Sequence, residues 1–134
     1  GPWVVTLDEL QSFEIPCKEN HAGANWNLRM QCWVNGKQVS DGNLGDMDWT
    51  FAEIIERASY GVDLFPGDVI GSGTVGTGCF LELNGTGKLN DPNFSEQWLQ
   101  PDDVVEMEIE GLGKLSNTIV AEETDWSILK LKKM

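Results

Sequence analysis

A glycine-rich stretch in the middle of the chain is the first place where residue types could do chemistry. Residues 71–78 read GSGTVGTG and follow a predicted short strand at Val69-Ile70. Their glycines match the GxGxxG spacing of a dinucleotide site, which presents a helix N-terminus to a pyrophosphate. Because residues 79–83 look like a strand without helical period, we expect no dinucleotide site here.

The same stretch offers backbone amides around Ser72, Thr74 and Thr77. Amides in such loops bind carboxylates in some proteins and only close tight turns in others. The residues alone favour the tight turn, and carboxylate binding stays open.

One carboxylate comes directly after this loop. Glu82 lies in the run Phe80-Leu81-Glu82-Leu83, which we expect to be a strand with Glu82 on the Phe80 side. A carboxylate in an apolar setting beside a glycine loop suits acid-base chemistry. An ordinary outward-facing strand residue would have the same sequence, so both interpretations remain.

Two other sets of polar residues carry weaker signals. Glu106, Glu108 and Glu110 alternate along one predicted strand, which could form a hard-cation site but is more typical of a solvated face. His21 stands in a polar loop with no Ser or Cys nucleophile motif to serve. We therefore expect His21 at the surface, without a catalytic role.

The elements that must position these residues are mostly strands. Residues 28–34 alternate between the two faces of a strand, Asn35-Gly36 follows, and residues 37–40 are again extended. Asn-Gly between two extended runs predicts a type I′ hairpin over residues 28–40. Further strands are predicted over 3–6, 104–110 and 114–120, and residues 127–134 are expected to form a short helix or strand.

One helix is clear from the sequence. An apolar stripe at positions 51, 54, 55 and 58 has the i, i+3, i+4, i+7 spacing of a helix face packed on a core. Thr50 and Glu53 have the spacing of a capping box, and Gly61 supplies the stop. The predicted fold class is therefore mainly β with one clear helix, in the α+β class.

Length, charge and cysteine content limit the number of domains, the kinds of partner and the cellular compartment that fit this chain. A chain of 134 residues is enough for one domain. With 22 acidic and nine basic side chains, the formal net charge of −13 argues against nucleic acid and against an anionic membrane as partners. Three scattered cysteines without CxxC spacing are typical of a reducing compartment, so we expect a cytoplasmic protein.

Five blocks of sequence together resemble the C-terminal part of the catalytic domain of the fumarylacetoacetate hydrolase family. In chain order they read GPWVVT, VNGKQVSDGN, DMDWTFAEIIERAS, PGDVIGSGTVGTGCFLEL and VVEMEIEGLGKLSN. The resemblance covers residues 1–120 and leaves residues 121–134 as a C-terminal tail. It implies a mixed β-sandwich roll, incomplete in this chain, and a homodimer.

The resemblance also implies an activity. Members of this family cleave or rearrange 2-keto acids and acylpyruvates with a divalent metal, usually Mg²⁺, that chelates the substrate. By the same resemblance, Thr74 contacts substrate, Gly73 allows close approach of the backbone, and Glu82 helps to activate the attacking water. The metal ligands, and the catalytic histidine and lysine, lie upstream of the GPW block, so no metal ligand is expected in this chain.

The resulting hypothesis is a metal-dependent hydrolase or lyase of a 2-keto acid or acylpyruvate, acting through an enolate. The 134-residue chain alone is expected to be inactive. Two alternatives remain: a non-catalytic binding or dimerisation domain of the same fold, and a tautomerase or decarboxylase of the same superfamily.

Overall fold

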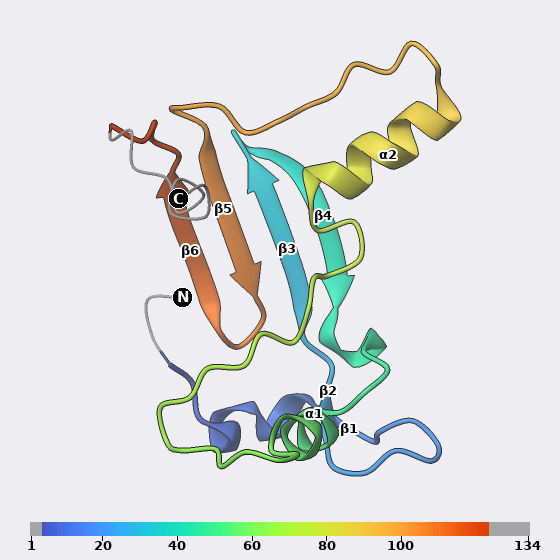
Figure 1. The fold of residues 1–134 in the computed structure, drawn as a ribbon, viewed down its shortest axis with the longest axis vertical. Coiled ribbons are helices and arrows are strands. Elements are labelled where there is room, and N and C mark those ends of the chain that lie inside the picture. Colours follow the sequence, from blue (N-terminus) through green and yellow to red (C-terminus); the bar gives the residue numbers. More distant parts are fainter. Residues whose placement is uncertain (1–3, 124–134) are drawn as a thin grey trace, which may run out of the picture.

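The computed structural model describes residues 4–123, which form an α+β structure with antiparallel sheets (Figure 1). Its elements are the 3-10 helices η1 (Leu7–Phe13) and η2 (Leu44–Asp46), the helices α1 (Phe51–Ala58) and α2 (Phe80–Asn90), and the strands β1 (Glu14–Ile15), β2 (Asn25–Trp26), β3 (Arg29–Val34), β4 (Lys37–Asn43), β5 (Val104–Ile109) and β6 (Gly113–Thr118). The α+β class is confirmed, with two α-helices where the sequence predicts one.

A four-stranded antiparallel sheet in the order β4-β3-β5-β6 is the largest unit. The hairpin between β3 and β4 is confirmed, because Asn35 (φ 51°) and Gly36 (φ 76°) both take the positive φ of a type I′ turn. The pairing of these strands shifts register between Cys32 and Trp33, which indicates a β-bulge. Within residues 4–123 the sheet stays open, as expected of an incomplete roll.

The two faces of the sheet differ in polarity. Register pairs on one face join apolar side chains, namely Met30 with Ile109, Cys32 with Met107 and Val34 with Val105. The opposite face carries mainly charged and polar residues together with Trp33, and there the Lys114 ammonium pairs with the Glu106 carboxylate at 2.7 Å and lies 5.2 Å from the centre of the Trp33 ring. The sheet therefore has one face that can pack against other elements and one that suits water.

The buried core lies at one end of the sheet, where η1 and α1 cover it (Figure 1). Leu10, Trp26 and Leu28 are its buried apolar residues, and Phe51 of α1 packs against Trp26 with ring centroids 6.1 Å apart. The capping box at the start of α1 is confirmed. The predicted core face is only partly buried, because Ile55 is 52% exposed.

The largest correction to the sequence prediction concerns residues 79–83. They begin helix α2 rather than a strand, with Cys79 as its N-cap residue. Leu and Glu are both strong helix formers, but residues 80–90 lack an apolar stripe, so periodicity gave no helical signal. Tertiary contacts fix this helix: the buried Asn84 side chain donates to the Gln97 carbonyl (2.8 Å) and accepts from the Gln97 N–H (3.0 Å).

Two predicted strands are absent from the described residues. Residues 4–6 lead directly into η1, whose first turn closes when the Glu9 N–H donates to the Thr6 carbonyl. Val69 and Ile70 are exposed and belong to no strand, because turns flank them and no described segment pairs with them. Trp3 and the element expected over residues 127–134 lie outside the described residues.

Candidate functional site

The glycine loop forms a tight turn with an unusual backbone. Gly73 has φ +97°, and open space surrounds the place where a Cβ would stand. The Gly78 N–H donates to the Val75 carbonyl at 2.7 Å, and Thr77 takes φ +63° although it is not glycine. Thr74 is exposed on this turn. The loop therefore presents Gly73 and Thr74 to the surroundings, where a ligand could reach them.

Glu82 is tied to this loop. It occupies the third position of α2, and its Oε2 accepts a hydrogen bond from the Thr77 N–H at 2.9 Å. Its expected place on an apolar strand is therefore wrong, because the carboxylate is exposed at a helix N-terminus. The loop does bind a carboxylate, which is its own Glu82. The hydrogen bond from Thr77 ties Glu82 to the loop that contains the other two candidate residues, Gly73 and Thr74.

Strand β4, at the edge of the sheet, packs against the glycine loop. A Cβ added at Gly42 of β4 would stand 2.5 Å from Val75 Cγ1, so Val75 occupies the space that a side chain there would fill. At the C-terminal side of the turn, a Cβ at Gly78 would meet the Val75 carbonyl at 2.4 Å. These two close approaches fix the turn against β4 and explain why glycine is needed at both positions.

Because helix α2 follows the loop, a dinucleotide site can no longer be excluded on the ground that a helix is missing. Sequence reasoning excluded that site because no helix was expected, and α2 now follows the glycines. The fingerprint still lacks its preceding strand, since residues 69–78 contain none. In addition, the Thr77 amide already bonds Glu82. The loop thus does not have the strand–turn–helix geometry of the dinucleotide motif.

A second pair of polar residues was missed by the sequence reasoning. His21 Nδ1 lies 3.0 Å from Glu53 Oε2, and both side chains are mostly buried. Glu53 also accepts hydrogen bonds from the backbone N–H groups of Thr50 (2.8 Å) and Ala22 (3.1 Å). The Thr50 bond, followed by the His21 bond, lowers the pKa of Glu53 to about 2. With Glu53 ionised, the bond requires a proton on His21 Nδ1.

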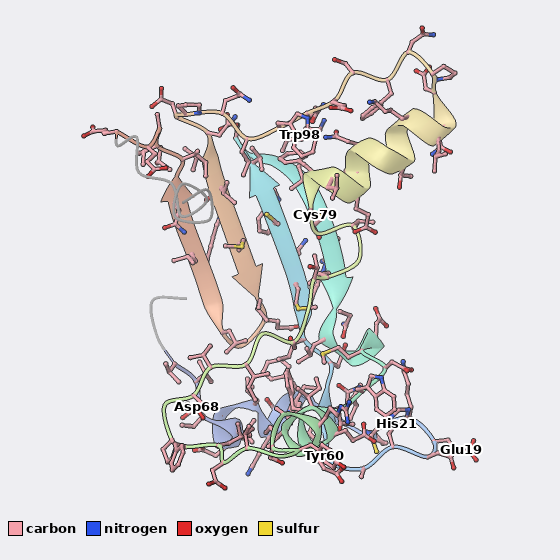
Figure 2. The ribbon with its side chains drawn as sticks, in the orientation of Figure 1. Glu19, His21, Tyr60, Asp68, Cys79 and Trp98 are labelled. Atoms are coloured by element: carbon pink, nitrogen blue, oxygen red, sulfur yellow. The ribbon has the colours of Figure 1, made fainter. Side chains whose placement is uncertain are left out.

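This pair is a structural contact between the 17–24 loop and α1. Figure 2 shows His21 beside α1, below the sheet, whereas Cys79 lies alongside the sheet at the start of α2. His21 lies in a loop as predicted, but its side chain is 16% exposed and pairs with α1 instead of standing free at the surface. The capping-box spacing identified Glu53, but no local pattern links it to a histidine 32 residues away.

No group of three or more His, Cys, Asp or Glu side chains that could hold a metal ion occurs within residues 4–123. Glu106 is paired with Lys114, and Glu108 is exposed on the polar face of the sheet. The described residues therefore do not fit a divalent-metal site. In the same residues, no helix combines the length and the apolar content needed to cross a membrane.

Comparison with known proteins identifies a family. The family model described as fumarylacetoacetate (FAA) hydrolase C-terminal matches residues 1–120. Uncharacterised proteins of Staphylococcus epidermidis and Staphylococcus aureus are 34% and 35% identical over 120 residues, which is 89% of this chain and 32% of theirs. The chain thus spans about a third of the length of these relatives.

A solved structure shares the fold. The crystal structure of a protein assigned as HpcE from Mycobacterium smegmatis matches with a TM-score of 0.65 and 26% identity, over 90% of this chain and 36% of that one. The sequence match and the shared fold agree. The chain belongs to the fumarylacetoacetate hydrolase family, in its C-terminal part.

Proposed function

We propose that the protein carrying this chain is a hydrolase or lyase that cleaves a carbon–carbon bond of a 2-keto acid or acylpyruvate. The observation that carries this proposal is the hydrogen bond from the Thr77 N–H to Glu82, which ties this carboxylate to the loop that contains Gly73 and Thr74. Family membership supports the reaction class.

Each residue has a role in this proposal. The Thr74 hydroxyl donates a hydrogen bond to an oxygen of the bound keto acid, and Gly73 lets the substrate approach the backbone. The Glu82 carboxylate takes up the proton of the attacking water as the water oxygen bonds to the acyl carbon. The carbon–carbon bond then breaks, the electron pair leaves with the keto-acid fragment as an enolate, and a proton completes that product.

A divalent cation, Mg²⁺ by resemblance to the family, would supply Lewis acidity toward the keto-acid oxygens. The described residues do not hold it, so in this proposal its ligands lie elsewhere in the protein that carries the chain. We further propose a cytoplasmic homodimer with a small-molecule substrate and no nucleic-acid or membrane partner. The unpaired state of Cys17, Cys32 and Cys79 is consistent with a reducing compartment.

The domain assignment is part of the same proposal, with residues 1–120 forming the C-terminal part of a catalytic domain and 121–134 a tail. The alternative of a binding or dimerisation domain is favoured by one observation, the exposure of large apolar side chains on and near the sheet. A tautomerase or decarboxylase would use the same residues without hydrolytic cleavage, and its products would reveal it.

The test is turnover of acylpyruvates by the full-length protein that carries this chain, with and without the Glu82→Gln substitution. Glutamine keeps the shape and an acceptor for the Thr77 N–H but cannot take up a proton. We expect kcat to fall roughly 10²–10⁴-fold. Glu108→Gln, at an exposed carboxylate on β5, is the matched control and should leave kcat unchanged. Wild-type turnover by a folded Glu82→Gln variant would contradict the role of Glu82.

A further inference from the structure

A cavity of about 520 Å³ lies between the apolar face of the sheet and the start of α2. Its walls come from strands β3 and β5, from α2 and from the segment after α2, and they include Cys32, Val34, Met107, Phe80, Leu83 and Trp98. None of the residues that line the cavity carries a charged side chain. Both its volume and its apolar lining match small-molecule sites.

The wall formed by Trp98 is held in place by specific contacts. The Asn84 side chain exchanges two hydrogen bonds with the backbone of Gln97, the residue before Trp98. The Trp98 indole N–H donates to Glu96 Oε2 at 2.9 Å, and Lys88 of α2 pairs with the same carboxylate group. In Figure 2, Trp98 and Cys79 lie at the same end of the sheet, beside α2. These contacts hold the wall in position without a ligand.

The cavity borders the glycine loop. Thr77 and Gly78 of the loop line it, and the Thr77 N–H donates a hydrogen bond to Glu82. A molecule whose polar end lies at Glu82, beside Thr77, can therefore extend its other end into the cavity. Leu81 and Met107 are 71% and 43% exposed, so part of the lining is open for an apolar group to cover.

We infer that this cavity binds the uncharged, apolar substituent of the substrate, either an alkyl chain of several carbons or an aromatic ring. The inference rests on the proposed function for the position of the keto-acid end. It assigns a substrate class, namely 2-keto acids and acylpyruvates with a long apolar tail in preference to pyruvate-sized ones. Cys32, Met107 and Trp98 then act as specificity-determining residues.

Alkylation of Cys79 gives a readout that does not depend on activity. Cys79 is exposed and lines the cavity, whereas Cys17 lies outside it and serves as an internal control in the same chain. The 134-residue chain is treated with iodoacetamide in the presence of pyruvate, 2-oxohexanoate, 2-oxooctanoate or octanoate, and each site is followed by peptide mass spectrometry. The concentration that gives half-protection measures binding.

We expect 2-oxooctanoate to slow alkylation of Cys79 at least fivefold, with no change at Cys17 and no protection by pyruvate. The half-protecting concentration should fall about three- to fourfold for each added methylene, as expected for burial of an alkyl chain. Met107→Trp, which fills the cavity, should abolish protection. Met30→Trp, on the same sheet face but outside the cavity lining, is the matched control and should keep it.

Three results would overturn the inference. Protection that does not depend on chain length would show that no apolar tail is bound. Slow alkylation of Cys79 without ligand in the full-length protein would show that other parts of that protein cover the cavity. Protection that rises with protein concentration would show that a second copy covers it. Equal protection by octanoate would support the apolar site but contradict recognition of the keto group, which separates this inference from the proposed function.

Discussion

The Glu82 carboxylate shows how one residue can serve both structure and chemistry. As the third residue of α2 it accepts the Thr77 N–H, which closes the glycine loop onto the helix. A carboxylate near a helix N-terminus is stabilised by the helix dipole. The same position leaves it exposed next to Thr77, where a substrate could reach it. The geometry therefore permits the proposed role.

Replacement of Thr74 by valine separates substrate recognition from support of the turn. The hydroxyl is proposed to bond a charged substrate oxygen, and its loss should lower kcat/KM by roughly tenfold to a hundredfold, or about 1.5–3 kcal/mol. Valine preserves the branched shape, so the melting temperature should change little. Steady-state kinetics and thermal melting are measured together. A lower melting temperature with unchanged kcat/KM would show that Thr74 only braces the turn.

Replacement of Glu53 by glutamine should alter acid stability. The folded-state pKa of about 2 lies below the ordinary value of 4.5, so the unfolded chain binds more protons between these pH values. The stability from the Glu53 charge is therefore complete above about pH 4.5 and is lost as the pH falls toward 2. In Glu53→Gln this part of the pH dependence should disappear.

Urea unfolding between pH 2 and 6 measures this effect. Glu56→Gln, at an exposed residue of the same helix, controls for the loss of one negative charge. Parallel curves for wild type and Glu53→Gln across that range would contradict the assignment.

The capping box at Thr50 and Glu53 could be predicted from local spacing. The His21 partner could not, because only the folded chain brings the 17–24 loop to α1.

At the scale of elements, α2 is a helix that the sequence pattern does not predict. Its residues have no apolar stripe, and it contains Gly85 and Gly87, which weaken a helix. The Asn84 contacts with Gln97 and the Glu82 contact with Thr77 stabilise it from outside. The β3–β4 hairpin and α1 were predictable because their signals are local. The helix was not, because its stabilising partners come from other segments.

The two glycines of α2 make a matched pair of substitutions. Gly85 has open space around it, so Gly85→Ala should stabilise the chain by about 0.5–1 kcal/mol through helix propensity alone. A Cβ at Gly87 would stand 2.5 Å from the Phe94 ring, so Gly87→Ala should instead destabilise it by about 1–3 kcal/mol. Urea unfolding of both variants measures the contrast. Equal stabilisation by both would show that Phe94 does not pack on α2.

Contact between the glycine loop and strand β4 can be tested by a double substitution. Gly42→Ala would place a Cβ against Val75 Cγ1 and should cost about 1–3 kcal/mol of stability, because a β-branched side chain moves little. Adding Val75→Ala removes the clashing methyl group and should recover most of that loss. A coupling energy near zero in the double-mutant cycle would contradict the packing of the loop on β4.

At the scale of the whole molecule, the buried core is small and many large apolar side chains are exposed. The buried apolar residues, Leu10, Trp26 and Leu28, lie at one end of the sheet, while the glycine loop runs along strand β4, with Val75 beside Gly42. The family could be predicted from five sequence blocks, and the α+β class from the strand patterns and the single helical stripe. The polar-versus-apolar character of the sheet faces also followed from alternation. The cavity beside α2 could not be predicted, because the sequence pattern gave the wrong element there.

The acidic surface by itself should bind Mg²⁺ only weakly. The net charge is −13, but the described carboxylates do not converge in threes, and a hard cation needs several converging oxygens. Calorimetric titration of the 134-residue chain should give a dissociation constant of about 1 mM or weaker, with no acylpyruvate cleavage. A Glu106→Gln, Glu108→Gln variant should titrate identically. A dissociation constant below about 10 µM would contradict this prediction.

The register shift between Cys32 and Trp33 affects how readily another chain can add a strand to the edge of the sheet. Strand β4 forms one outer edge of the sheet within the described residues, and an outer edge exposes unpaired backbone groups to which strands of other molecules can add. A bulge increases the local twist and disrupts the ladder, so a flat strand fits such an edge poorly. The other edge, β6, carries Lys114, and a lysine on an edge strand disfavours pairing with another strand. Both features oppose the regular stacking of strands on which fibril growth depends.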